Sequence, residues 1–168
     1  MMNSMLSYIL LHKPDKWETV NNYDESYKLF DLEVNSLEYI NIITLFNSIS
    51  PKIKSIKRVQ NPFQYGRFKL RQEMLQNMLE ETAYYVVHMS KLKIALKFTC
   101  DYRRLTCQYS NKQPCFISSV SEAISKAMLN EMEDKKNILI LSKIPGPTKT
   151  QSDYYIRYII DFKKLEIN

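Results

Sequence analysis

Few residues in this chain of 168 could carry out acid–base or metal chemistry: the sequence holds two histidines and three cysteines. His88 directly follows an apolar run at 84–87, whereas His12 lies in a polar segment and carries no signal. Histidine serves as a general acid or base, or as a metal ligand, near neutral pH. A lone histidine at the end of an apolar strand is more often structural, so His88 by itself does not predict a catalytic site.

The three cysteines, Cys100, Cys107 and Cys115, are odd in number and loosely spaced. We therefore expect no disulfide framework and a reducing intracellular compartment, nuclear or cytoplasmic. A zinc site would require folding to bring all three to His88, and the chain has no CxxC pair of the kind that structural zinc sites use. We predict no metal site.

The charge balance of 24 Lys and Arg against 18 Asp and Glu gives a net charge of +6. Such an excess can attract nucleic acid or acidic proteins. The tightest basic cluster, Lys52, Lys54, Lys57 and Arg58, has no nucleic-acid motif beside it, so we expect a solvated face and keep RNA binding as an alternative. The apolar segment at 5–11 is too short to span a bilayer and lacks a cleavage site, so we expect no membrane association.

A strand and a helix are predicted in the middle of the chain. Alternating Ile53, Ile56 and Val59 indicate a half-buried strand, and Asn61-Pro62 indicates the cap and first position of a helix. Apolar residues then recur at spacings of three to five, which predicts an amphipathic helix. Its buried side is expected to hold Phe63, Phe68, Leu70, Met74, Leu75 and Met78, and its solvent side Gln64, Arg67, Lys69, Arg71 and Glu73.

The remaining pattern predicts one α+β domain over residues 1–168, without repeats or a linker. Gly66 lies inside the predicted helix, where it costs about 1 kcal/mol relative to Ala, so we expect close packing there. Trp17 is expected to pack an irregular N-terminal segment onto the core. We predict further strands at 29–34, 84–87, 115–118, 138–144 and 154–162, helices at 37–49, 62–79, 91–97 and 120–132, and a turn at 145–147.

The stretch at 52–74, KIKSIKRVQNPFQYGRFKLRQEM, resembles the strand and helix that open the catalytic domain of the poly(ADP-ribose) polymerase (PARP) family, particularly its mono-ADP-ribosyltransferase branch. Six further segments are similar to motifs of that family in the same order. They are Trp17 with FDLEVNSLEYINIITLFNSI (30–49), YVVHMS (85–90), CDYRRL (100–105), PCFISS (114–119), NILILSKI (137–144) and YIRYIIDF (155–162). The resemblance implies an ADP-ribosyltransferase-like fold, with mixed or antiparallel β-sheets flanked by helices.

In that family a His, a Tyr and, in polymerising members, a Glu surround NAD. By the resemblance, His88 takes the position of the His. Met89 stands where the family has a Gly whose backbone holds the nicotinamide amide, and a side chain there should crowd the pocket. Cys115 replaces the stacking Tyr and offers no aromatic face.

Two further cofactor positions of the family match weakly. The Ser that bonds the amide falls at Ala123 and a second stacking Tyr at Lys126, although a slip of two residues would bring Ser125 to the Ser position. The resemblance therefore implies vestigial catalytic positions at His88 and Cys115 and vestigial cofactor positions at His88, Met89, Ala123 and Lys126.

A strand segment is predicted to be deleted near the C-terminus. The family places tens of residues, including the Glu-bearing strand, between the motifs that match 137–144 and 155–162, and only residues 145–154 intervene here. We expect an exposed sheet edge where that strand would have paired, able to dock a partner strand or a second copy of the chain. The chain also has only two Gly, and neither lies in a pocket motif.

These departures imply a catalytically inactive PARP-like domain that acts as a protein-interaction or scaffolding module and holds no cofactor. One alternative is a divergent NAD-dependent mono-ADP-ribosyltransferase that uses His88. A second alternative is an RNA-associated factor of antiviral or regulatory type, which the positive net charge would serve. The oligomeric state stays open.

Overall fold

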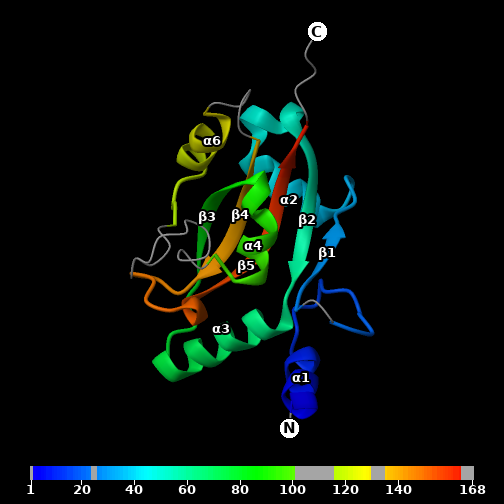
Figure 1. Ribbon diagram of the computed structural model, residues 1–168, viewed down its shortest axis with the longest axis vertical. Helices are drawn as coiled ribbons and strands as arrows, with labels where there is room; N and C mark the ends of the chain where they lie inside the picture. The colour runs from blue at the N-terminus through cyan, green and yellow to red at the C-terminus, as the bar shows by residue number, and fades with distance from the viewer. Residues whose placement is uncertain (1, 24–25, 101–115, 130–134, 164–168) are drawn as a thin grey trace.

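The computed structural model describes residues 2–23, 26–100, 116–129 and 135–163 (Figure 1). Five strands form one sheet in the order β1-β2-β5-β4-β3, and each neighbouring pair is antiparallel. The architecture is α+β, as predicted. The strands are β1 (Lys28–Asp31), β2 (Ile53–Gln60), β3 (Glu81–His88), β4 (Lys136–Lys143) and β5 (Tyr154–Phe162).

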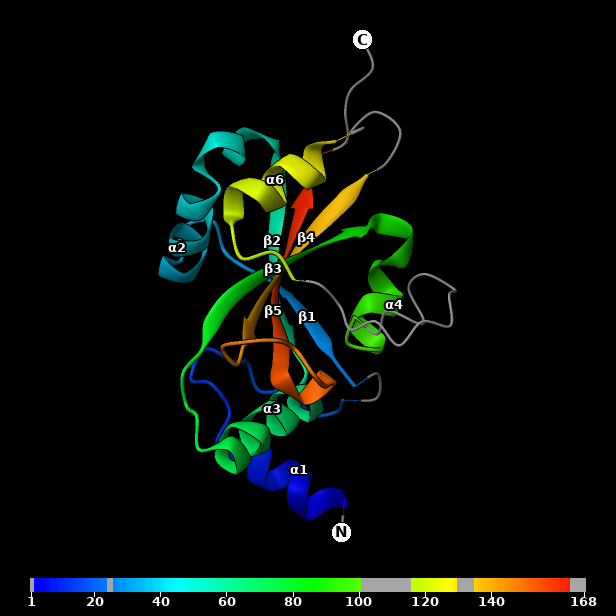
Figure 2. The ribbon, with the colours of Figure 1, turned by 90° about the vertical axis from the view of Figure 1, so that its left-hand side faces the viewer.

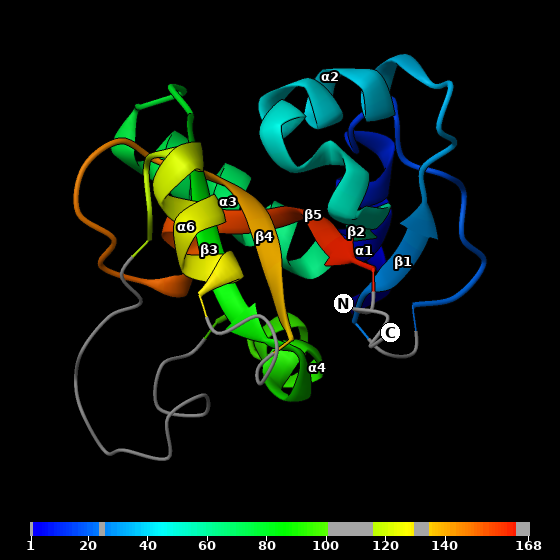
Figure 3. The same ribbon diagram turned by 90° about the horizontal axis from the view of Figure 1, so that it is seen from above.

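Helices cover both faces of this sheet and one of its ends (Figures 2 and 3). The α-helices are α1 (Met2–Leu11), α2 (Leu37–Leu45), α3 (Pro62–Leu75), α4 (Leu92–Lys97) and α6 (Val120–Met128), and the 3₁₀ helices are η1 (Asn47–Lys52), η2 (Met89–Lys91) and η3 (Gln151–Asp153). Helices α2 and α6 pack on one face and α4 on the other. Helix α3 crosses one end of the sheet, and α1 lies beyond it.

The core has two parts, one on each face of the sheet. Phe46 and Ile138 are fully buried in the part beneath α2 and α6, and Ala95 and Leu139 are fully buried in the part beneath α4. All residues of β4 between its two ends are buried. The sequence between the two ends of β4, NILILS, is apolar at most positions because helices cover both faces of that strand.

Several predicted elements differ from the structure at their ends. Residues 2–11 are helical rather than irregular, because α1 packs against α3 instead of extending over the core. The helix predicted at 37–49 ends at Leu45 and is followed by η1, which contains Pro51. The helix predicted at 62–79 ends at Leu75, because Gln76 adopts the left-handed conformation at φ 50°.

The remaining differences lie at the two ends of the sheet and near α6. The strand predicted at 29–34 ends at Asp31. Of the strand predicted at 115–118, Cys115 lies outside the described residues, and Ile117 forms a single antiparallel bridge to Tyr84 of β3. Helix α6 ends at Met128, and residues 130–132 of the helix predicted at 120–132 lie outside the described part.

Strands β4 and β5 follow one another directly in the sheet, joined by residues 144–153. The expectation of an exposed edge at this place is wrong, since β4 also pairs with β3 and β5 also pairs with β2. The outer strands are β1 and β3, and Ile117 exchanges two backbone hydrogen bonds of 2.8 Å with Tyr84 on the outer side of β3. Within the described ranges, no helix is both long and apolar enough to cross a membrane.

Candidate functional site

His88, the residue that matches the family's His, ends β3 and caps the 3₁₀ helix η2. Its Nδ1 accepts a hydrogen bond from the backbone N–H of Ser90 at 3.1 Å and lies 2.6 Å from Ser90 Oγ. The neighbouring Met89 donates its N–H to the carbonyl of Lys135, and its side chain is half exposed. These contacts give His88 a structural role at the end of the strand.

The other positions that the resemblance implies do not gather around His88. Ala123 is fully buried in the core beneath α6, where its side chain cannot reach a ligand. Lys126 and Ser125 are exposed on α6, and the carbonyl of Lys126 accepts a hydrogen bond of 3.5 Å from Lys136 Nζ. Cys115 lies outside the described residues.

Of the four residues that could have formed a metal site, the structure describes His88 and Cys100. Among all the residues that it describes, no three His, Cys, Asp or Glu side chains are grouped closely enough to hold a metal ion. Cys100 is fully buried, and this burial raises the pKa of its thiol. Cys107 and Cys115 lie outside the described residues.

A pocket of about 250 Å³ lies on the sheet face that α2 covers in part. Strands β2 and β5, helix α2 and the N-terminal segment supply its walls, and neither His88 nor the other vestigial residues line it. We call it the sheet pocket, and it is lined by Pro14, Asp15, Lys16, Trp17, Glu38, Arg58, Val59, Tyr155, Arg157 and Tyr158.

A buried ion pair forms one side of the sheet pocket. Both Arg58 and Glu38 have side chains about one-tenth exposed (11% and 10%), and Arg58 Nε donates to Glu38 Oε1 at 3.1 Å. Tyr158 Oη donates to the same oxygen at 2.6 Å. Burial disfavours the carboxylate, but the hydrogen bonds from Arg58 and Tyr158 outweigh it and hold the pKa of Glu38 below its usual value. Burial and the hydrogen bond to Glu38 raise the pKa of Tyr158 to about 12.

The side chain of Gln60 fastens the N-terminal segment to the sheet beside this pocket. Gln60 is fully buried; its Oε1 accepts from the N–H of Glu18 at 2.7 Å, and its Nε2 donates to the carbonyl of Glu18 at 3.0 Å. A further hydrogen bond of 3.2 Å joins Nε2 to Tyr23 Oη. Trp17 is buried as predicted, with its ring 5.4 Å from that of Tyr65. The segment therefore holds one wall of the sheet pocket in place.

A β-bulge directs Arg157 into the same pocket. Ile140 pairs with Tyr158 and the next residue, Leu141, pairs with Ile156, so Arg157 is an extra residue in β5. Arg157 and Tyr158 therefore both line the pocket, although consecutive strand residues ordinarily point to opposite faces. The Arg157 guanidinium carbon lies 5.3 Å from the centre of the Tyr158 ring. The hydrophobic pattern of the sequence carried no sign of this bulge.

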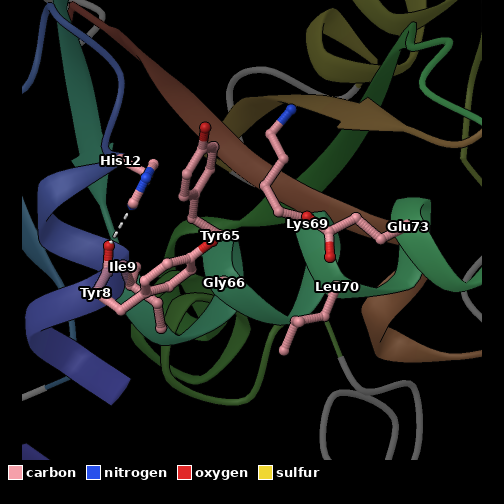
Figure 4. Close-up of a pocket in the computed structure, with 8 residues that line it drawn as sticks. All are labelled: Tyr8, Ile9, His12, Tyr65, Gly66, Lys69, Leu70 and Glu73. Atoms are coloured by element: carbon pink, nitrogen blue, oxygen red, sulfur yellow. Dashed lines mark hydrogen bonds between the residues drawn. The ribbon is translucent and has the colours of Figure 1, made fainter. Parts of the chain in front are cut away.

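A second pocket, of about 210 Å³, lies between α1 and α3 (Figure 4). We call it the helix pocket, and it is lined by Tyr8, Ile9, His12, Tyr65, Gly66, Lys69, Leu70 and Glu73. The close packing expected at Gly66 is confirmed, because a Cβ atom there would lie 2.5 Å from Ile9 Cδ1.

The burial predicted for helix α3 is right at some positions and wrong at others: Phe68 is buried and Arg67 and Glu73 are exposed as predicted, but Phe63 and Met78 are exposed rather than buried. Gln64 and Gln72 are buried, whereas Leu70, Met74 and Leu75 are exposed. Gln64 Oε1 accepts from the N–H of Ile156 at 3.1 Å, and the amide of Gln72 lies 3.4 Å from the carbonyl of Leu79, so both glutamines bond to backbone groups. The exposed apolar residues continue past the helix end. We call this set the α3 outer surface: Leu70, Met74, Leu75, Met78 and Leu79.

Comparison with protein-family models gives no match for this chain, and comparison with curated proteins gives none either.

Proposed function

We propose that this chain is a catalytically inactive ADP-ribosyltransferase-like domain that acts as a protein-interaction module. The family resemblance supports the fold assignment, because four of the segments similar to the family's strands coincide with β2, β3, β4 and β5, whereas PCFISS contributes only the bridge at Ile117. The antiparallel sheet flanked by helices is consistent with it as well.

Three observations support the loss of transferase chemistry. His88 Nδ1 is engaged by Ser90, and Ala123 is enclosed in the core, so neither is arranged to hold NAD. Direct pairing of β4 with β5 leaves no strand between them that could present the family's Glu. A fold does not imply its usual activity, because activity belongs to the site rather than to the scaffold.

The α3 outer surface carries the proposal of protein binding. Met74, Met78 and Leu79 are 76%, 62% and 70% exposed, and they fall within residues 74–79, at the end of α3 and just after it. Contiguous exposed apolar residues mark interaction sites, and methionine side chains adapt readily to a partner surface. We propose that a protein partner covers this surface with apolar side chains of its own.

The basic cluster at 52–58 favours a protein partner over RNA. Lys57 Nζ lies 3.1 Å from Asp31 Oδ1 and Lys54 Nζ lies 3.9 Å from Asp161 Oδ2, while Arg58 is paired with Glu38. These carboxylates offset the positive charge that would attract the phosphate backbone of RNA.

The binding proposal is tested with a photo-crosslinking residue at position 74 and the same residue at position 89 as a control. Both positions hold an exposed methionine. Met89, however, lies on η2, which follows the C-terminal end of β3, whereas α3 precedes the N-terminal end of that strand. We expect one protein to crosslink reproducibly at position 74 only. When that protein is purified, Met74→Glu should weaken its binding at least about tenfold, and Met89→Glu should not. Equal crosslinking at both positions, or equal affinity of both variants, would contradict the proposal.

Loss of transferase chemistry is tested separately by titration with NAD. A ligand that binds the folded state raises its melting temperature by mass action, so we expect no shift at millimolar NAD and no labelling from labelled NAD. A saturable shift, together with labelling that is lost in His88→Ala, would establish the NAD-dependent transferase alternative instead.

A further inference from the structure

We infer that the sheet pocket binds a small molecule carrying a phosphate monoester, with Arg157 and Lys16 as its cationic contacts. This inference does not depend on the proposed protein-binding role, because the pocket and the α3 outer surface share no residue.

The charge of the sheet pocket is the first argument. Lys16, Arg58 and Arg157 line it together with Asp15 and Glu38. Glu38 is hydrogen-bonded to Arg58 and to the hydroxyl of Tyr158, and the charge of Lys16 also contributes to lowering its pKa. Asp15 is exposed at the wall. In the described part of the chain, neither Lys16 nor Arg157 forms a salt bridge with a carboxylate, so the pocket presents two cations to an incoming anion.

The position of Arg157 is the second argument. Bulges often lie next to functional sites, where they redirect a side chain, and this bulge directs the guanidinium into the pocket. A guanidinium has five N–H donors, and Nη1 of Arg157 reaches Ser142 Oγ only at 3.4 Å, a long hydrogen bond. An oxyanion with several acceptor oxygens would satisfy the guanidinium better, because arginine matches phosphate oxygens in a bidentate way.

The size of the pocket limits the ligand. Pockets for drug-sized molecules measure about 300–1,000 Å³, and this one measures about 250 Å³. A volume below that range favours a compound no larger than a mononucleotide, whereas a dinucleotide exceeds it. The pocket is also separate from the position that the resemblance assigns to NAD, because none of His88, Met89, Ala123 and Lys126 lines it.

Phosphate is favoured over carboxylate by its charge. A phosphate monoester carries about −1.5 to −2 charges at pH 7, and in the described part of the chain neither Lys16 nor Arg157 forms a salt bridge with a carboxylate. A single carboxylate would leave one of them unmatched. The phosphate group can belong to a sugar phosphate or to a mononucleotide, and both have this charge.

The test is calorimetric titration of the full chain with ribose 5-phosphate and with AMP, compared with adenosine and acetate. We expect saturable binding of at least one phosphate compound and none of adenosine or acetate. Binding of AMP alone would identify a mononucleotide as the ligand, and equal binding of both would identify the sugar phosphate portion as sufficient. No saturable binding of either phosphate compound at millimolar concentration, or acetate binding as tightly, would overturn the inference.

Charge-neutralising variants then assign the contacts. Arg157→Gln should weaken binding at least about tenfold and Lys16→Gln severalfold, while Lys93→Gln on the exposed side of α4 should leave it unchanged. Lys16 is exposed, so its variant is expected to fold and to decide the question if Arg157→Gln is unstable. Equal affinity in the wild type and Lys16→Gln, with Arg157→Gln folded and also unaffected, would overturn the assignment.

Discussion

Asp153 ties the connection between β4 and β5 to helix α3. Its Oδ1 accepts from Arg71 Nε at 2.8 Å, and its Oδ2 accepts from the N–H groups of Lys149 and Thr150 at 2.8 and 3.0 Å. Burial disfavours the charged carboxylate, but these hydrogen bonds outweigh it and lower the pKa of Asp153. The folded pKa lies below the unfolded one, so the carboxylate stabilises the fold fully above about pH 4 and loses this effect as the pH falls through the folded pKa.

We therefore expect Asp153→Asn to lower the free energy of unfolding by about 2 kcal/mol at pH 7, because hydrogen bonds to a charged group are lost. The difference between variant and wild type should shrink as the pH falls below the folded pKa. Urea unfolding at neutral and acidic pH measures both values. Asp31→Asn, at a carboxylate with a side chain 71% exposed, should change stability by no more than about 0.5 kcal/mol. An equal loss of stability at both pH values would show that the charge of Asp153 does not explain the effect.

The hydroxyl of Tyr158 stabilises the fold through its hydrogen bond to Glu38. Its raised pKa means that its hydroxyl stabilises the fold fully below about pH 10 and loses this effect as the pH rises toward about 12. Tyr158→Phe removes the donor to Glu38 and should cost about 1.5–3 kcal/mol. Spectrophotometric titration should lose one late-titrating phenol in this variant, and Tyr39→Phe should leave that phenol in place. Titration of all tyrosines near pH 10 would contradict the contact.

The sequence placed His88 at the end of a strand, and the structure agrees. It did not show the ion-pair network, because the partners lie far apart along the chain: Arg58 is 20 residues from Glu38, and Tyr158 is 120 residues from it. Periodicity and caps report on neighbours within a few residues, so they could not pair these side chains or place Arg157 beside them.

Helix α3 shows how far local pattern determines an element. Its start was predicted correctly, since the side chain of Asn61 accepts from the N–H of Gln64 at 3.0 Å and Pro62 follows. Of the residues predicted to form its buried side, only Phe68 is buried. The spacing of apolar residues identifies the buried face of a helix only when the buried residues are the apolar ones. Here Gln64 and Gln72 are buried because they bond to backbone groups of other segments.

The contact between α1 and α3 depends on Gly66, which gives a prediction for this pair of helices. Gly66→Leu would improve helix propensity by nearly 1 kcal/mol, but its side chain would displace Ile9. We expect faster amide hydrogen exchange in α1 and little change in the strands. Gly66→Ala combined with Ile9→Ala makes room for the added methyl group and should keep exchange in α1 close to that of Ile9→Ala alone. Unchanged protection of α1 in Gly66→Leu would contradict this contact.

At the scale of the whole molecule, the sheet joins segments from both halves of the chain. The last strand, β5, lies in the middle between β2 and β4, and Arg71 of α3 reaches Asp153 across 82 residues. The sequence indicated all five of these strands and the turn at 145–147. It could not give their order, because a strand's pattern records which side is buried and not which strand lies beside it.

This arrangement predicts that the chain unfolds as one unit. Trp17, the single tryptophan, reports on the N-terminal segment, whereas far-ultraviolet circular dichroism reports on the sheet and helices. Because Gln60 of β2 fastens that segment, the two signals should give the same midpoint in urea. Ile160 is fully buried at the centre of the sheet, so Ile160→Ala should cost about 2–5 kcal/mol and lower both midpoints equally. An earlier Trp17 transition, or a shift in only one signal, would show that the N-terminal segment unfolds separately from the sheet.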